Sequence, residues 1–328
     1  MDIRDFKYCL AIRTLGQACE MYQRELDSLN SQTIKPEKIL VYLAEGYDKP
    51  KETIGWETVI YVKKGMVAQR ALNFDEVTTP YVLFLDDDVY LPNDGVEKLA
   101  MGLLENNGDC IAADTFPNHK MSVVSKILGF VTNWAYPHYS SKWAIKVQHN
   151  GSFSYNNNPT KDVYFAQSAA GPCSLWRLDA FRSIHFADEL WLDRLGFAYG
   201  DDLLCFYKLH VNGGKMLLHY TSGVKHLDAQ SSRSKYNADP TKLQKRARAW
   251  FILWWRIDYS LNNRSDWHRA ISLLSFSAKC VWGFFLHLTY SLVKLSPKPL
   301  LYFIKGNVDG YKFVHSDAYK NVPNFIVK

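Results

Sequence analysis

The sequence has few of the features that mark secreted or cysteine-stabilised proteins. Its six cysteines form no Cys-x-x-Cys pair and are scattered through apolar stretches, which argues against a disulfide framework and against a zinc site built on cysteines. The first residues, Met1-Asp2-Ile3-Arg4-Asp5, lack the apolar segment of a signal peptide. We therefore expect the cysteines to be small core residues and the protein to be cytoplasmic.

Internal repeats and low-complexity stretches are also missing, so repeat architectures and disordered proteins are disfavoured. Of the 328 residues, 47% are hydrophobic and 22% are charged, which is typical of a globular protein with a substantial core. This length accommodates one large α/β domain and an appendage. Aromatic residues make up 15% of the chain, a content that suits sugar rings, nucleobases, membrane interfaces and protein cores equally well.

Positive charge is concentrated in the last part of the chain. From residue 231 to the end there are 16 Lys and Arg but 5 Asp and Glu, whereas the preceding part carries a net charge of −5. This change in composition divides the chain into a domain over residues 1–230 and a basic, aromatic helical tail over residues 231–328. The tail is expected to meet an anionic surface, and its aromatic content favours a membrane over a nucleic acid.

Three adjacent carboxylates follow a short apolar run in the first third of the chain. Tyr81-Val82-Leu83-Phe84-Leu85 has no polar alternation, which is typical of a parallel strand buried on both faces, and it leads directly into Asp86-Asp87-Asp88. Ligands of open α/β sheets bind beyond the carboxyl ends of the strands. A divalent cation would make such a cluster of acids favourable. The alternative is an acidic turn before the next helix.

Strands and helices alternate around this run. Strands are predicted at Lys7–Ile12, Lys38–Ala44, Thr58–Val62 and Cys110–Ala113, and a last strand at Lys215–Tyr220. Helical spacing occupies the intervals at 17–29, 65–72 and after Asp94. The pattern predicts an α/β fold in which helices flank a mixed, mostly parallel nucleotide-binding sheet.

Two later segments carry further candidate chemistry. The polar and aromatic stretch Phe116–Lys161, which includes Asn133, Trp134 and Tyr136, is predicted to be irregular and either grips an acceptor or forms an unspecific lid. The small residues between Ala169 and Ser174 permit close approach of the backbone to a ligand.

A second pair of acids stands where a helix is predicted to begin. Asp201-Asp202 precedes apolar residues at helical spacing, and the helix ends at Asn212-Gly213-Gly214. A carboxylate at a helix N-terminus is favoured by about 0.3–1 kcal/mol. This explains one Asp as a helix cap but gives no structural reason for the other.

The tail is predicted to contain two long helices. Asp239-Pro240 opens the first, with Asp as the cap and Pro at the first position. The second runs from about Trp267 to Val293, and its uncharged stretch Cys280–Val293 is 14 residues long, short of the roughly 20 that a membrane span requires. It is predicted to be an amphipathic interfacial segment, although packing on the catalytic domain explains the same residues.

Three sequence motifs follow one another along the chain. Leu-Phe-Leu-Asp86-Asp87-Asp88-Val matches a DXD motif, Gly171–Arg177 matches a small-residue acceptor segment before a Trp/Arg turn, and Gly200-Asp201-Asp202-Leu-Leu matches an acidic motif that opens a helix. Over about residues 5–230 the chain resembles an inverting family-2 glycosyltransferase of the GT-A fold. The resemblance implies a nucleotide-sugar half over about residues 1–115 and an acceptor half over 116–230.

The resemblance also implies roles for individual residues. Asp88 would bind a divalent metal, Mn²⁺ or Mg²⁺, together with Asp86 and His226, and Asp202 would be the general base. Acceptor contacts would come from Asp201, Trp176 and Arg177. Nucleotide-sugar contacts would come from Arg13, Thr14, Glu45, Arg70, Asp86 and Asp87.

The chemistry agrees with these roles. Displacement of a nucleoside diphosphate needs neutralisation of the leaving group and a carboxylate that deprotonates the acceptor hydroxyl. The expected function is metal-dependent, inverting transfer of a sugar, with UDP-hexose as the default donor, to a glycan or lipid-linked glycan in cell-surface polysaccharide synthesis. Contact with the inner face of the cytoplasmic membrane through the tail is the expected location.

The sequence also allows three alternative functions. A sugar-nucleotide nucleotidyltransferase would need a Gly-rich loop after the first strand, but Ile12–Gly16 holds one glycine. A haloacid-type phosphatase would use an early DxD motif and would leave Asp201-Asp202 without a role. A catalytically inactive glycan-binding or assembly subunit of the same fold is the non-enzyme alternative.

Overall fold

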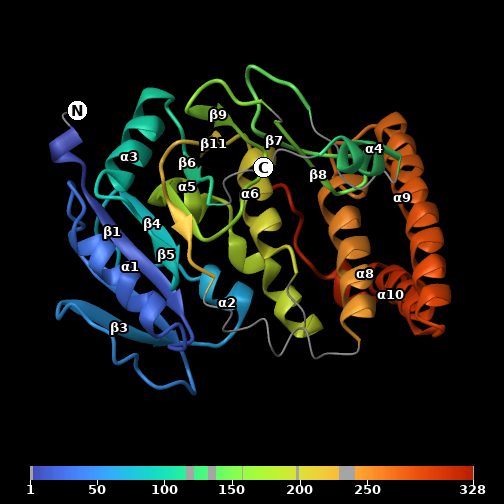
Figure 1. Ribbon diagram of the computed structural model, residues 1–328, viewed down its shortest axis with the longest axis horizontal. Coiled ribbons are helices and arrows are strands. Elements are labelled where there is room, and N and C mark those ends of the chain that lie inside the picture. The colour runs from blue at the N-terminus through green and yellow to red at the C-terminus, as the bar shows by residue number, and fades with distance from the viewer. Residues whose placement is uncertain are drawn as a thin grey trace.

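The computed structural model describes residues 3–115, 122–131, 138–156, 158–196, 199–228 and 241–327. In this part of the chain an eight-stranded sheet has the strand order β3-β2-β1-β4-β10-β6-β11-β9 (Figure 1). Six of its strands run in one direction, and β10 and β9 run in the other. The strands are β1 Tyr8–Thr14, β2 Ile39–Ala44, β3 Glu57–Val62, β4 Tyr81–Asp86, β6 Cys110–Ala113, β9 Val163–Phe165, β10 Cys173–Arg177 and β11 Met216–His219.

Helices lie on both faces of this sheet. They are α1 Glu20–Asn30, α2 Met66–Arg70, α3 Gly95–Glu105, α5 Leu178–Ser183 and α6 Asp201–Val211, with 3₁₀ turns η1 Ile3–Asp5 and η2 Phe186–Leu195. Helix α4 Val123–Val131 lies away from the sheet, toward the C-terminal helices (Figure 1). Strand β4 is buried on both sides, as predicted for a central strand. Leu83 and Leu85 share a core with α1 and α3, and Val82 and Phe84 share another with α2, α5 and α6. The predicted α/β architecture with a mostly parallel sheet is confirmed.

The stretch Phe116–Lys161 contains more regular structure than the sequence indicated. Its described residues include α4 and a small hairpin of β7 Ile145–Val147 and β8 Phe153–Tyr155. The prediction of an irregular segment was therefore wrong for these parts. Asn133, Trp134 and Tyr136 lie outside the described residues.

The C-terminal region is helical, as predicted, but its buried side chains join the core of the sheet domain. It comprises α8 Lys242–Trp254, the π-helical turn η3 Trp255–Tyr259, α9 Asp266–Val293, α10 Lys298–Val314 and α11 Asp317–Lys320. Ile252, Leu253 and Ile257 pack in the same cluster as α6. The predicted helix start at Asp239-Pro240 lies outside the described residues.

A buried ion network also holds this region to the sheet domain. The carboxylate of Glu189, in η2, accepts hydrogen bonds from Arg256 Nη2 at 2.7 Å and from Lys208 Nζ at 3.2 Å. All three side chains are buried, so each charge depends on the others for compensation. The helical region is thus an integral part of the folded domain.

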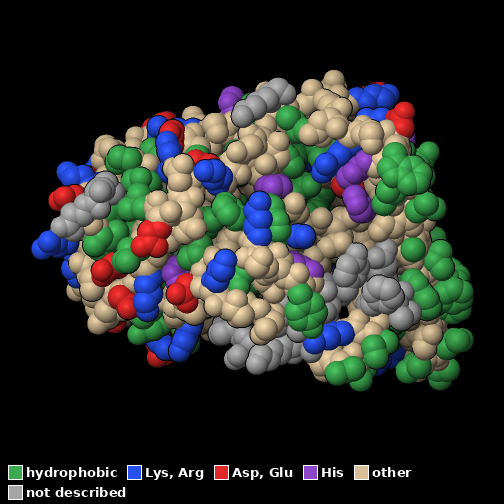
Figure 2. Space-filling model, turned by 90° about the horizontal axis from the view of Figure 1, so that it is seen from above, with side chains coloured by type: hydrophobic (Ala, Val, Ile, Leu, Met, Phe, Trp, Pro, Cys, Tyr) green, Lys and Arg blue, Asp and Glu red, His purple; other side chains and the backbone are tan. Residues whose placement is uncertain are grey.

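One face of α9 remains exposed. The helix is 28 residues long and, within the described residues, it is the one long and apolar enough to cross a membrane by length and composition. The uncharged stretch Cys280–Val293, on which the prediction of an interfacial segment was based, is only the second half of this helix. Figure 2 shows hydrophobic side chains gathered at the end of the molecule where Figure 1 places α9. Ser272, Phe276 and Lys279 are buried against the protein, so the helix is docked along one side.

Candidate functional site

The two acidic motifs meet at the edge where the parallel strands end. Asp86 is the last residue of β4 and lies in register with Arg13 near the end of β1. Strand β10 is antiparallel to β4, so the loop that precedes it arrives at the same edge, where Asp86 N donates to Pro172 O at 2.9 Å. Helix α6 also begins here, with Asp201 as its first residue, as the sequence predicted.

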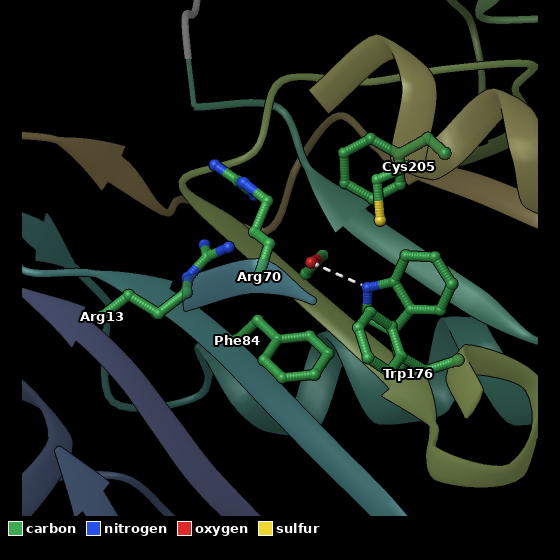
Figure 3. Close-up of a pocket in the computed structure, with 8 residues that line it drawn as sticks. Arg13, Arg70, Phe84, Trp176 and Cys205 are labelled. Atoms are coloured by element: carbon green, nitrogen blue, oxygen red, sulfur yellow. Dashed lines mark hydrogen bonds between the residues drawn. The ribbon is translucent and has the colours of Figure 1, made fainter. Parts of the chain in front are cut away.

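Two arginines connect these segments. Arg70, at the end of α2, donates from Nε to Asp201 Oδ2 at 2.7 Å, and its Nη2 lies 2.9 Å from Asp202 Oδ1 and 3.9 Å from Asp86 Oδ1. Arg13 Nη2 donates to Asp86 Oδ1 at 2.8 Å. The carboxylates raise the pKa of Arg70 against the effect of its burial. Figure 3 shows both side chains beside one small cavity.

Gly171 closes this network through its backbone. Its carbonyl oxygen accepts from Arg13 Nη2 at 3.3 Å and from Arg70 Nη1 at 3.5 Å, and its N–H donates to Asp202 Oδ2 at 3.0 Å. A Cβ at this position would lie 2.5 Å from Asp202 Oδ1 and 2.7 Å from both terminal nitrogens of Arg70. The close backbone approach that the small residues 169–174 predicted is therefore an approach to protein side chains.

The two acids of α6 have different environments. The side chain of Asp201 is 5% exposed and that of Asp202 is 34% exposed. Burial and the neighbouring Asp202 raise the pKa of Asp201 to about 6, although Arg70 acts in the opposite direction. Asp202 is the acid that can meet a substrate, with Arg70 and the Gly171 amide holding its carboxylate in place.

Asp87 and Asp88 point to other partners than Asp86 does. Thr14 Oγ1 donates to Asp87 Oδ2, and burial raises the pKa of Asp87 to about 7, assisted by the adjacent acids. Asp88 Oδ1 lies 3.1 Å from His226 Nε2. This interaction raises the pKa of His226. The predicted neighbourhood of Asp88 and His226 is present.

A two-stranded sheet fixes that pair. β5 Val89–Tyr90 pairs with β12 Lys225–His226, which sets His226 opposite Val89, and Leu227 N donates to Asp88 O at 2.7 Å. The side chain of Asp88 is 11% exposed and that of His226 is 20% exposed. A carboxylate oxygen and an imidazole nitrogen in this position fit a divalent ion that takes its other ligands from phosphate and water. Asp86 instead turns one oxygen toward the arginines.

Two residues predicted for acceptor contacts are not brought to this edge. Trp176 is 1% exposed, stacks on Phe206 and donates from Nε1 to Ser174 Oγ. It lines the inner wall of the cavity of about 10 Å³ beneath Arg13 and Arg70 (Figure 3). Arg177 pairs in register with Tyr81, at the opposite end of β4 from the acids, because β10 runs antiparallel. Neither residue belongs to the acceptor site proposed below.

Glu45 remains a candidate for base contact. It is exposed and directly follows β2, whose end is in register with Thr14 at the same edge of the sheet. Two supporting residues were not predicted. Gln69 donates to the carbonyl oxygens of Thr14 and Tyr42 and so joins the ends of β1 and β2. Its position next to Arg70 in the sequence is the signal that could have found it.

The second unpredicted residue is Glu25, on α1. Its Oε2 accepts from the N–H of Val89 at 2.8 Å, directly after the three acids. Complete burial raises the pKa of this carboxyl well above its usual range, and the three nearby aspartates add to the effect. In the sequence it is an ordinary acidic residue in an amphipathic helix, so no signal marked it.

Comparison with known proteins gives matches among solved structures and none among family models or curated sequences. No protein-family model and no curated protein sequence matches the chain. Among solved structures, the chain is similar to residues 1–349 of S. aureus TarS, with 12% identity and a TM-score of 0.49, over 96% of this chain and 91% of that one. The same protein in complex with UDP-GlcNAc matches with 12% identity and a TM-score of 0.49, over 92% and 79%. A longer TarS structure gives 11% and 0.46, over 84% and 43%. The function proposed below therefore rests on the geometry of the site and not on this similarity.

Substitution of Gly171 by Ala tests the network. The added methyl group would displace Arg70 or Asp202, and we expect a loss of about 1–3 kcal/mol in the free energy of unfolding, measured by urea denaturation. Gly46→Ala is the control, because a Cβ there meets nothing within 4 Å and only its φ of +85° is unfavourable. Its loss reports backbone strain alone, roughly 1–2 kcal/mol. Because the φ of Gly171 lies outside the left-handed region, a loss below about 0.5 kcal/mol in Gly171→Ala would contradict the account.

Proposed function

We propose that the protein is a metal-dependent, inverting glycosyltransferase that moves a hexose from a nucleotide-sugar to a glycan hydroxyl. The observation that carries this proposal is the double contact of Arg70, which lies 3.9 Å from Asp86 and 2.9 Å from Asp202 through the same nitrogen. The acids at the end of β4 and those at the start of α6 thus face one site. A leaving-group site and a base for the acceptor are needed together for in-line displacement.

Asp202 is proposed as the general base. Its carboxylate is partly exposed, and Arg70 and the Gly171 amide fix its orientation through charge-assisted hydrogen bonds. Asp201 is largely buried and bonded to Arg70 Nε, so its proposed role is to hold Arg70 beside Asp202 and to help shape the acceptor side. A single displacement with this base would invert the anomeric configuration.

Asp88 and His226 are proposed to hold a divalent ion, Mn²⁺ or Mg²⁺. The ion would supply positive charge to the departing diphosphate. Few protein ligands are needed because Mg²⁺ commonly binds through one or two carboxylates, substrate phosphates and water. Asp87, held by Thr14, and the exposed Glu45 are proposed to face the nucleoside, with UDP as the expected nucleotide. Arg13 is proposed to orient Asp86.

The acceptor is proposed to be a lipid-linked or cell-surface glycan that is presented at the inner face of the cytoplasmic membrane. The exposed face of α9 carries large apolar side chains, among them Leu274, Trp282, Phe285 and Leu292. Beside it lies a cavity of about 410 Å³ lined by the cations Lys242, Arg246, Lys294 and Lys298 and by Tyr290 and Tyr302. Apolar surface next to cationic side chains suits an interfacial helix on anionic lipid.

Nucleotide binding is expected to depend on metal. A thermal-shift panel of UDP, GDP, dTDP and CMP, each with Mn²⁺ and with EDTA, should show one nucleotide that stabilises the protein only with the ion. At about 100 times Kd the gain is roughly 2.7 kcal/mol. Asp88→Ala should abolish the shift. Asp94→Ala is the control and should keep it, because the side chain of Asp94 is 48% exposed and pairs with Lys98 on α3.

If no nucleotide gave a metal-dependent thermal shift, the proposed glycosyltransferase function would be contradicted. That result would favour a glycan-binding or assembly subunit that has the fold without the activity. Stabilisation by a nucleoside triphosphate in preference to every diphosphate would instead favour a sugar-nucleotide nucleotidyltransferase.

Membrane contact can be tested with vesicles. The protein should bind vesicles that contain phosphatidylglycerol at low salt, and binding should weaken as salt screens the cations. The double variant Lys294→Glu, Lys298→Glu should reduce binding by tenfold or more, because each cation near an anionic surface contributes about 1 kcal/mol. The double variant Lys49→Glu, Lys51→Glu, at exposed positions in the loop before β3, is the charge-matched control. Equal loss with the control, or no vesicle binding, would contradict membrane contact.

A further inference from the structure

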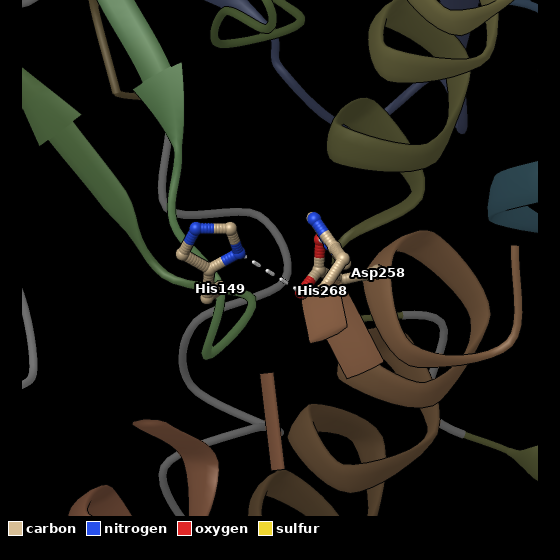
Figure 4. A group of neighbouring side chains, drawn as sticks. All are labelled: His149, Asp258 and His268. Carbon is tan, nitrogen blue, oxygen red and sulfur yellow. Dashed lines mark hydrogen bonds and ion pairs between the residues drawn. The ribbon is translucent and has the colours of Figure 1, made fainter. Parts of the chain in front are cut away.

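A cluster of two histidines and one aspartate lies away from the acidic site. It joins His149, in the turn between β7 and β8, Asp258, in η3, and His268, in the first turn of α9 (Figure 4). One nitrogen of each histidine and one oxygen of Asp258 all lie within 4.8 Å of one another. The β7–β8 turn and two successive elements of the C-terminal region, distant from that turn in the sequence, therefore present ligand atoms to one point.

The distances between these atoms are close to those of a metal site. His268 Nε2 lies 2.8 Å from Asp258 Oδ1, and His149 Nδ1 lies 3.6 Å from Asp258 Oδ2. Nitrogen and oxygen ligands that bind Zn²⁺ at about 2.0–2.1 Å in a tetrahedron are about 3.3 Å apart. Since no two of the three ligand atoms are more than 4.8 Å apart, relative shifts of at most about 1.5 Å would bring all three into that arrangement.

The carboxylate provides a second, independent indication. Asp258 is 3% exposed, and its Oδ2 accepts no hydrogen bond from the residues that the structure describes, although it faces His149. A buried carboxylate oxygen without a donor is costly, and a cation at this point would satisfy it. Arg264 Nη2 is 4.0 Å from the other oxygen, Oδ1, and donates to Tyr207 Oη at 3.2 Å, so it does not occupy the position next to Oδ2.

The supporting structure holds the ligands in place. The carbonyl oxygen of His149 accepts from Trp254 Nε1 at 3.0 Å and from Ser272 Oγ at 3.1 Å. In the same turn, Lys279 Nζ donates to Ser152 Oγ at 2.7 Å. The side chain of His149 is 45% exposed, which leaves a path for an ion from solvent. Fixed ligands and an entry path are requirements for a metal site.

We infer that His149, Asp258 and His268 form a binding site for a divalent transition-metal ion, with Zn²⁺ as the best-suited ion. Two imidazoles and one carboxylate suit Zn²⁺ and not Mg²⁺, which prefers oxygen ligands, so this site differs in selectivity from the acidic one. On binding, the Nε2 proton of His268 is lost to its other ring nitrogen or to solvent, and water completes the fourth position. The ion fastens the β7–β8 turn to the start of α9.

The experiment uses the full chain, freed of metal with chelator, in an Asp88→Ala background that removes the acidic site. Titration with Zn²⁺ alone, followed by equilibrium dialysis, should give one bound ion per chain, and Co²⁺ should give the visible absorption of a tetrahedral site. His149→Gln and His268→Gln should each weaken Zn²⁺ binding at least tenfold. Gln at 268 can still bond to Asp258, and circular dichroism checks that both variants fold.

His185→Asn is the matched control, since His185 is exposed, lies outside the cluster and has a φ of +48° that Asn tolerates. It should leave the affinity unchanged. Failure of the Asp88→Ala protein to bind Zn²⁺, or equal affinity in the two cluster variants and the control, would overturn the inference. Neither outcome bears on nucleotide binding, which the thermal-shift panel tests separately.

Discussion

The guanidinium group of Arg70 is the point on which the site depends. It contacts the acids of α6, lies near the acid that ends β4, and donates to the backbone of the loop before β10. Without it, the buried carboxylate of Asp201 would lie next to Asp202 with no compensating positive charge, and a buried carboxylate in that situation loses its charge or disrupts the fold. One cation thus determines both the local structure and the separation of a buried acid from an accessible one.

The central strand and both acidic motifs could be predicted from the sequence, because each is encoded by residues that are neighbours in the chain. Val82–Leu85 is apolar without alternation, so a central strand followed by acids at its carboxyl end was predictable, as was the helix that starts at Asp201. The failure at Trp176 and Arg177 has a different origin. The pattern of β10 does not encode its direction, and because β10 runs antiparallel to β4, its last residue lies at the far end of the sheet. Hydrogen bonds between distant segments, such as that of Glu25 with Val89, leave no pattern in a single sequence.

The sequence of the helical region allowed two interpretations, of which the structure bears out packing on the sheet domain, while membrane contact stays a proposal. Its basic, aromatic composition predicted contact with a membrane, and packing on the catalytic domain was the alternative. Glu189, Lys208 and Arg256 form a buried network that fixes η3 to the sheet domain, while the outer face of α9 stays apolar and exposed. A helix docked on one side and apolar on the other would hold the active-site edge at a constant position relative to a membrane surface. The proposed zinc site lies at this junction and would stiffen it.

The central claim is that the acids of β4 and of α6 serve one reaction with separate roles. Asp202→Asn tests it most directly, by comparing metal-dependent nucleotide binding with release of UDP from a panel of UDP-hexoses in the presence of glycan acceptors. The account predicts that nucleotide affinity stays within a few-fold of wild type while turnover falls by about 10²–10⁴, the usual contribution of a general base. Unchanged turnover, or a loss of nucleotide binding as large as the loss of turnover, would contradict it.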